Sequence, residues 1–230
     1  MKFFDSLMDE ADALLAPYRQ RTYPLGKKWR DLGRNTLVLK RDEAFELTGV
    51  GFNLVTARPI EPSGITVVGP ELSALNGDTP FARISLIQTE AVEDEQMAFD
   101  TVRKVEYQKY HYFPEGFMVR TVSSSHKENV RVTKKALQAG ISFEAVGNLL
   151  AEKYLELPAV KSARIIYVTD SAVDFAALEA LAEKNDRITE TLNHIMQNIP
   201  LDCSACRLKP VCDEVEGMRE LHFKTAGQGM

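Results

Sequence analysis

The sequence predicts an α+β protein in which a mixed or antiparallel sheet packs against helices and a C-terminal cysteine-rich tail binds metal. Three observations support this fold class. Short runs rich in β-branched and aromatic residues, separated by Gly, Pro and Asn, follow one another between residues 36 and 88. Segments with apolar residues at helical spacing then alternate with further strand-like runs. All three cysteines fall within ten positions near the C-terminal end.

Composition excludes several classes of protein. Hydrophobic residues at 44% and charged residues at 27% are globular values, which excludes a mainly disordered, collagenous or disulfide-framework chain. A net charge of −5 argues against nucleic-acid binding driven by phosphate neutralisation. No stretch approaches the ~20 apolar residues that span a bilayer, and Asp5 and Asp9 interrupt the apolar run that a signal peptide needs. We therefore expect a cytoplasmic protein with neither a nucleic-acid nor a membrane partner.

Residues 1–34 are expected to form an amphipathic helix and a basic linker. Apolar side chains recur at helical spacing from Phe3 to Leu15, and Pro17 marks the end of the helix. The linker that follows carries five basic residues, namely Arg19, Arg21, Lys27, Lys28 and Arg30.

Residues 35–200 are expected to form the α+β domain itself. Pro114 should end one long helix, and Ser142 is a plausible N-cap for another. The first four strands are expected to be antiparallel. Strands are predicted at 36–40, 44–48, 53–57, 64–68, 81–88, 117–122, 130–133 and 163–169, and helices at 93–113, 134–139, 142–156, 171–184 and 186–198.

Residues 201–230 carry the expected metal-binding tail. Cys203, Cys206 and Cys212 follow a C-x2-C-x5-C pattern, and His222 stands ten positions beyond the last cysteine. Three cysteines this close make a poor disulfide framework, because any one bridge leaves a thiol over. Two thiolates from one turn can bind the same metal, and both iron–sulfur clusters and zinc accept this donor set. The competing interpretation is a surface tail with ordinary thiols, and His194 is an alternative fourth ligand.

A second candidate site is a basic stretch that runs from Arg120 through His126 to Lys135. Such a stretch could bind a phosphorylated ligand, for example the nucleotide end of coenzyme A, although charge runs are commonly solvated faces. The ligand-binding candidates are Arg120, Lys127, Arg131 and Lys134.

Several segments of the chain resemble one known family. The tail, preceded by Asp186 and Arg187, is similar to the C-x2-C-x8-C-x9-C iron–sulfur motif of acetyl-CoA synthase, the beta subunit of the CO dehydrogenase/acetyl-CoA synthase complex. The order of the similar segments is the same as in that family, and the resemblance runs over residues 36–223. The upstream segments are ITVVGPELSAL at 65–75, HYF at 111–113 followed by Glu-Gly, NVRVTKKALQAG at 129–140 and RIIYVTD at 164–170.

The resemblance implies a cofactor and partners. A [4Fe–4S] cluster is expected on Cys203, Cys206 and Cys212, with His222 at the position of the fourth cysteine of the family. The partners would be a corrinoid protein or other subunits of a one-carbon complex, in anaerobic one-carbon or corrinoid metabolism. Zinc in a Cys3His site is the alternative, in which case the chain is a non-redox binding module.

Two departures from the family pattern limit these expectations. The Cys-Gly-Cys that holds the distal nickel in the resembling family has no counterpart after Cys212, and Met118 replaces a tryptophan associated with the coenzyme A region. We therefore expect no nickel site and no acetyl-CoA synthesis by this chain alone. An accessory or docking role is expected, or a place in a split synthase whose nickel site lies on another subunit.

Overall fold

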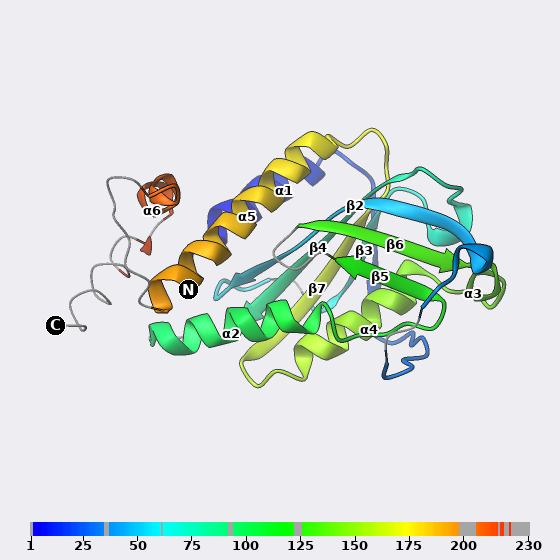
Figure 1. Cartoon of the computed structure of the whole chain (residues 1–230), viewed down its shortest axis with the longest axis horizontal. Coiled ribbons are helices and arrows are strands. Elements are labelled where there is room, and N and C mark those ends of the chain that lie inside the picture. Colours follow the sequence, from blue (N-terminus) through cyan, green and yellow to red (C-terminus); the bar gives the residue numbers. More distant parts are fainter. Residues whose placement is uncertain are drawn as a thin grey trace.

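A computed structural model describes residues 2–34, 37–60, 62–91, 94–121, 126–197, 206–215, 217–218 and 221. Within these residues the core is one seven-stranded sheet, in the order β1-β3-β7-β4-β2-β6-β5 (Figure 1). The α+β fold class is confirmed. The strands are β1 Gln20–Pro24, β2 Glu43–Thr56, β3 Gly64–Val68, β4 Pro80–Thr89, β5 Phe117–Thr121, β6 Lys127–Thr133 and β7 Val160–Val168.

The sheet is mixed. β2 pairs with β4, and β3 with β7, in parallel, whereas the remaining neighbours are antiparallel. The expectation of antiparallel pairing among the first strands is therefore wrong in part, because β2 and β3 each lie between one parallel and one antiparallel partner.

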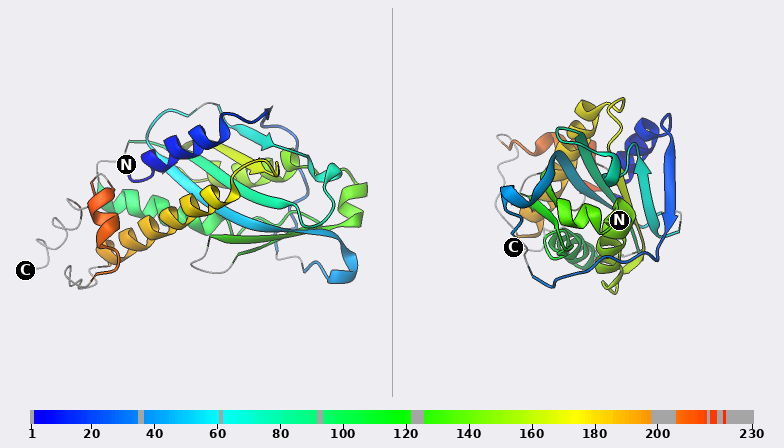
Figure 2. Two further views of the ribbon diagram at one scale, coloured as in Figure 1. Left: turned by 90° about the horizontal axis from the view of Figure 1, so that it is seen from above. Right: turned by 90° about the vertical axis from the view of Figure 1, so that its right-hand side faces the viewer.

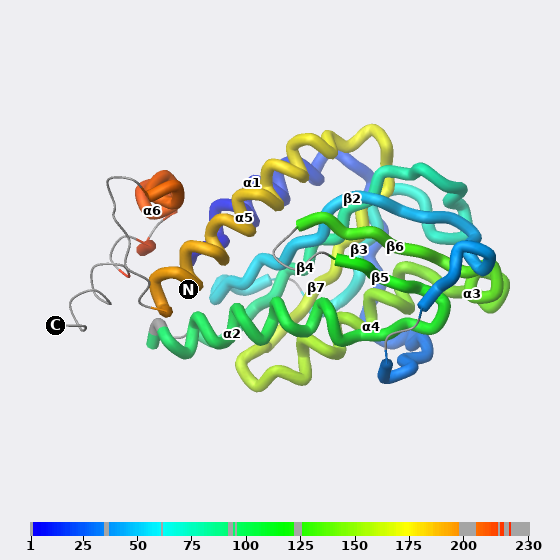
Figure 3. Tube along the Cα trace, in the orientation of Figure 1, coloured from blue at the N-terminus to red at the C-terminus, as the bar shows by residue number. Residues whose placement is uncertain are grey.

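Helices cover both faces of the sheet (Figures 1 and 2). α1 and α5 contact each other and β2, whereas α4 packs on β3 and β7 with α2 beside it. α5 also leads the chain from the sheet to α6 (Figure 3). The helices are α1 Asp5–Leu15, α2 Glu95–Gln108, α3 Lys134–Gln138, α4 Phe143–Leu155, α5 Phe175–Met196 and α6 Lys209–Glu214.

Side-chain caps define where several helices begin. The Ser142 hydroxyl accepts a hydrogen bond from the Ala145 N–H, which confirms it as the N-cap of α4. Asp94 and Asp174 cap α2 and α5 in the same way, and each such cap contributes about 1 kcal/mol to the stability of its helix. α1 is the expected amphipathic helix, since its apolar face is buried in the core.

Two glycines explain why one long strand was predicted as two short ones. Residues 44–48 and 53–57 were expected to be separate strands, but β2 runs through Gly49 and Gly51. A Cβ atom at Gly49 would lie 1.6 Å from the Phe81 carbonyl oxygen, and one at Gly51 would lie 1.6 Å from Glu128 Oε2. These glycines therefore allow neighbouring groups to approach β2 closely and do not mark a turn.

Other element predictions also need correction. The predicted strand at 36–40 is absent from the described residues 37–40, where a short 3-10 helix begins at Lys40. The expected basic linker contains β1, an edge strand whose partly exposed residues have no apolar pattern. α2 ends at Gln108, well before Pro114. The helices predicted at 171–184 and 186–198 form one helix, α5.

A buried ion pair lies inside the sheet, on the side covered by α2 and α4. Arg83 of β4 and Glu128 of β6 are each 1% exposed, and Arg83 Nε donates to Glu128 Oε2 at 3.0 Å. Arg83 Nη1 donates to Asn53 Oδ1 at 3.1 Å, and the Asn53 amide donates to Glu106 of α2 at 2.7 Å. Lys109 then pairs with Glu106 at 2.7 Å. A continuous polar chain therefore connects the middle of the sheet to the surface of α2.

Candidate metal centre

Two of the three cysteines lie in the described part of the tail. Cys206 and Cys212 are both half-buried. The Cys206 carbonyl accepts a hydrogen bond from the Lys209 N–H at 3.2 Å, and the Cys212 N–H donates to the Leu208 carbonyl at 3.3 Å. A turn after Cys206 thus leads directly into α6, which carries Cys212. Cys203 and His222 lie outside the described residues.

α6 is anchored to the rest of the protein. Leu208 and Val211 are buried, α6 contacts α5, and Cys212 packs against the hydrophobic core. Pro210 occupies the first turn of α6, where a missing N–H costs nothing. α6, which carries Cys212, is therefore held against α5.

A cavity of about 710 Å³ lies between α2 and the second half of α5. Arg207, the residue after Cys206, is part of its wall and pairs with Glu190 of α5. His194, the alternative fourth ligand, also lines the cavity, and its Nδ1 atom is buried with no hydrogen-bond partner among the described residues. Glu106 and Lys109, the last two residues of the polar chain that begins at Arg83, also line this cavity.

The four predicted basic candidates each lie in different surroundings. Arg131 lies between Glu43 and Glu46, at 2.9 and 3.2 Å, and Lys127 pairs with Glu179. Arg120 lines a cavity of about 420 Å³ together with Met118. Lys134 is exposed at the beginning of α3. The structure does not bring the four residues together around one cavity.

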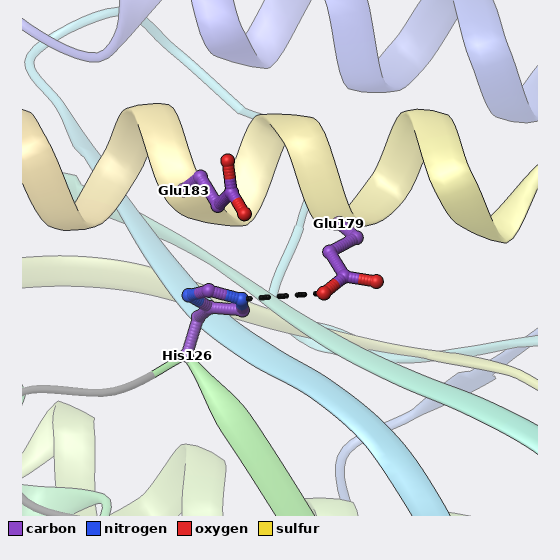
Figure 4. Close-up of side chains that lie close together, drawn as sticks. All are labelled: His126, Glu179 and Glu183. Atoms are coloured by element: carbon purple, nitrogen blue, oxygen red, sulfur yellow. Dashed lines mark ion pairs between the residues drawn. The ribbon is translucent and has the colours of Figure 1, made fainter.

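One cluster was not predicted. His126, immediately before β6, faces Glu179 and Glu183 of α5, and one potential ligand atom from each lies within 4.8 Å of the others (Figure 4). Asp186, one helical turn further along α5, contacts His126 Nδ1 at 3.0 Å. The Gly51 N–H donates to the His126 carbonyl at 2.8 Å, which fixes the backbone of His126 beside β2. The i, i+4 spacing of the glutamates is visible in the sequence, but their contact with His126 is not.

None of the helices in the described ranges has the length and apolar character needed to cross a membrane.

Comparison with known protein families gives a match. The family described as CO dehydrogenase/acetyl-CoA synthase complex beta subunit matches residues 35–173, more than half of the chain. The matched range contains β2 to β7 and ends just before α5. No curated protein matches the sequence significantly.

Proposed function

Since this chain belongs to the CO dehydrogenase/acetyl-CoA synthase complex beta subunit family, we propose that its tail binds a metal cluster and serves an accessory role in that complex. Members of the family bind metal clusters and work in multi-subunit assemblies, and the chain has an acetyl-CoA synthase-related role in one-carbon metabolism. The observation that carries the proposal is the position of Cys206 just before α6 and of Cys212 within α6, a helix that packs on α5 next to the matched domain.

The proposed cofactor is a [4Fe–4S] cluster. Cys203, Cys206 and Cys212 would supply thiolates and His222 the fourth ligand. The half-buried side chains of Cys206 and Cys212 fit this assignment, because thiolates are the usual cluster ligands. The cluster would supply electron transfer. One imidazole in place of a thiolate makes the site less negative, which favours a higher reduction potential.

Zinc is the second candidate. A closed Cys3His site would be structural, because all four positions are filled by protein ligands. The packing of α6 on the core favours this alternative, since a structural zinc ion would fasten the tail to α5. The chain would then be a binding module without redox activity.

The docking role is proposed for the end of the molecule that carries the tail. The cavity between α2 and α5 brings Arg103 and Arg207 together with Glu190, so a partner there would meet charges of both signs. A corrinoid protein or another subunit of the complex is the proposed partner. We further propose that residues 201–230 form a metal-binding segment distinct in function from the α+β domain at 35–200, on whose core α6 packs.

Anaerobic purification with metal and sulfide analysis tests the proposal. The wild-type chain should contain iron with sulfide, or else zinc. Cys206→Ser should lose most of this metal while the circular dichroism of the α+β domain is unchanged. His111→Ala is a matched control, because His111 stacks on Tyr107 of α2 and lies far from the cysteines in the sequence.

Cobalt substitution identifies the tail site when the metal is zinc. Cobalt bound to thiolates shows sulfur-to-metal charge-transfer absorption, whereas cobalt on nitrogen and oxygen ligands does not. The triple Cys→Ser variant should lack both iron and this absorption. Full iron content in the triple variant, or an undiminished charge-transfer band, would contradict the proposed tail site.

A further inference from the structure

The imidazole of His126 has an unusual environment. Its Nε2 atom is buried and has no hydrogen-bond partner among the residues that the structure describes. Buried ring nitrogens in folded proteins are normally hydrogen-bonded. Two carboxylates lie nearby, since Glu179 Oε1 is 3.8 Å from Nε2 and Glu183 completes the cluster (Figure 4).

The other ring nitrogen has a defined partner. Asp186 Oδ2 lies 3.0 Å from Nδ1 and, as a carboxylate oxygen, accepts a hydrogen bond from Nδ1–H. This contact favours the tautomer that carries the proton on Nδ1, which leaves the Nε2 lone pair directed towards the glutamates. A carboxylate that holds Nδ1–H in this way is the usual outer partner of a metal-bound histidine.

The distances suit a metal ion better than a direct ion pair. A separation of 3.8 Å between Nε2 and Glu179 Oε1 exceeds the 2.7–3.2 Å of an N–H···O hydrogen bond. A tetrahedral zinc ion with bonds of about 2.1 Å places its ligand atoms about 3.4 Å apart. Glu179 and Glu183 are 43% and 49% exposed, so their side chains can adjust by the remaining fraction of an ångström.

We propose that His126, Glu179 and Glu183 form a zinc-type divalent-cation site, oriented by Asp186 and separate from the cysteine tail. An imidazole with two carboxylates suits zinc, whereas magnesium and calcium prefer oxygen ligands. Three protein ligands leave a fourth position for water, and the exposure of the glutamates opens that position to solvent. The ion would tie the beginning of β6 to α5.

The positive charge of Lys127 opposes cation binding at this site. The Lys127 ammonium pairs with Glu179, whose carboxylate would also bind the ion. Arg187 lies 3.9 Å from Glu183, at a more distant and exposed position. Metal binding therefore has to displace or share the Lys127 contact, and removal of that charge should increase zinc affinity.

Zinc titration of the full-length chain tests the inference. The triple variant with Cys203, Cys206 and Cys212 changed to Ser, prepared without iron, should bind one equivalent of zinc, and its cobalt form should lack thiolate absorption. His126→Ala in this background should abolish that equivalent. Asp186→Ala should weaken zinc binding by about 10- to 100-fold, as loss of an outer partner does in other sites.

Two further variants sharpen the comparison. Glu183→Gln should lose most of the affinity, whereas Lys127→Gln should keep or increase it. Glu152→Gln is the matched control, because Glu152 is a similarly exposed helical glutamate, 40% against 43% for Glu179, and is likewise paired with a lysine, Lys28. Its zinc affinity should equal that of the background.

Folding controls keep the test decisive. His126→Gln retains a polar side chain near Asp186. If His126→Ala fails to fold, His126→Gln is the variant to titrate in its place. Zinc should also shift the His126 ring signals in NMR spectra of the background variant. Zinc binding that is unchanged in His126→Gln and Glu183→Gln, equal binding of magnesium, or no zinc binding by the background would each overturn the inference.

Discussion

Glu128→Gln removes the only carboxylate that pairs with Arg83 among the described residues. The two side chains are each 1% exposed, and Arg83 Nε donates to both carboxylate oxygens, at 3.0 and 3.2 Å. Burial is the largest single influence and lowers the pKa of Arg83, but the Glu128 charge together with Tyr154, Tyr112 and Tyr167 holds that pKa above its ordinary value. The variant therefore leaves a charged guanidinium in the sheet without a counter-charge.

The expected loss of stability is about 3 kcal/mol. Removing one partner of a buried ion pair costs roughly 3–5 kcal/mol, because the remaining charge stays buried. The lower end applies here, since Arg83 Nη1 keeps its hydrogen bonds to Asn53 and Ser85. Arginine cannot relieve the strain by losing its proton. The free energy of unfolding of a folded domain is about 5–15 kcal/mol. The variant should therefore still fold, but it should unfold at a much lower denaturant concentration.

Urea unfolding measures the difference. Glu152→Gln, which breaks the exposed pair with Lys28, should cost less than about 1 kcal/mol and serves as the control. The double variant Arg83→Met/Glu128→Leu should recover much of the loss, because neither charge remains. If Glu128→Gln is no less stable than the control variant, the Arg83 charge is compensated in another way and the reasoning is refuted.

The remaining predictions concern the surface and the tail. Metal retention by the tail should fall as pH is lowered, since protons compete for the thiolates, and dialysis at a series of pH values measures this. Lys127→Ala should raise the pKa of Glu179, because the Lys127 hydrogen bond and charge hold that pKa below its ordinary value; NMR titration would show no change if the contact is absent in solution. His222→Cys should lower the potential of a cluster in redox titration, and an unchanged potential would remove His222 from the ligand set. The purified chain with added nickel should not make acetyl-CoA, and synthesis would contradict the accessory role.

Local signals predicted most elements of the fold, and the errors have physical causes. The Ser142 cap and the apolar run of β3 each involve only residues close together in the sequence, and the sequence predicted both. β1 was missed because an edge strand with partly exposed residues has no apolar alternation. In the sequence Gly49 and Gly51 resemble a turn. In the structure their missing side chains leave space for the Phe81 carbonyl and the Glu128 carboxylate of adjacent strands. Such a contact is tertiary, so no window of sequence contains it.

The same distinction separates the two candidate metal sites. The cysteines of the tail are visible in the sequence because all three lie within ten positions of one another. The acidic face of α5 was hidden by the predicted helix break at Asn185. That residue is buried, and its amide donates to the Asn53 carbonyl at 2.7 Å, so α5 continues through it and places Asp186 on the face that carries Glu183. His126 was grouped with a basic stretch, but its partners are set by the pairing of β6 with β2 and by the packing of α5 on β2. A site whose ligands come from segments more than fifty residues apart follows from register and packing, which only the folded chain provides.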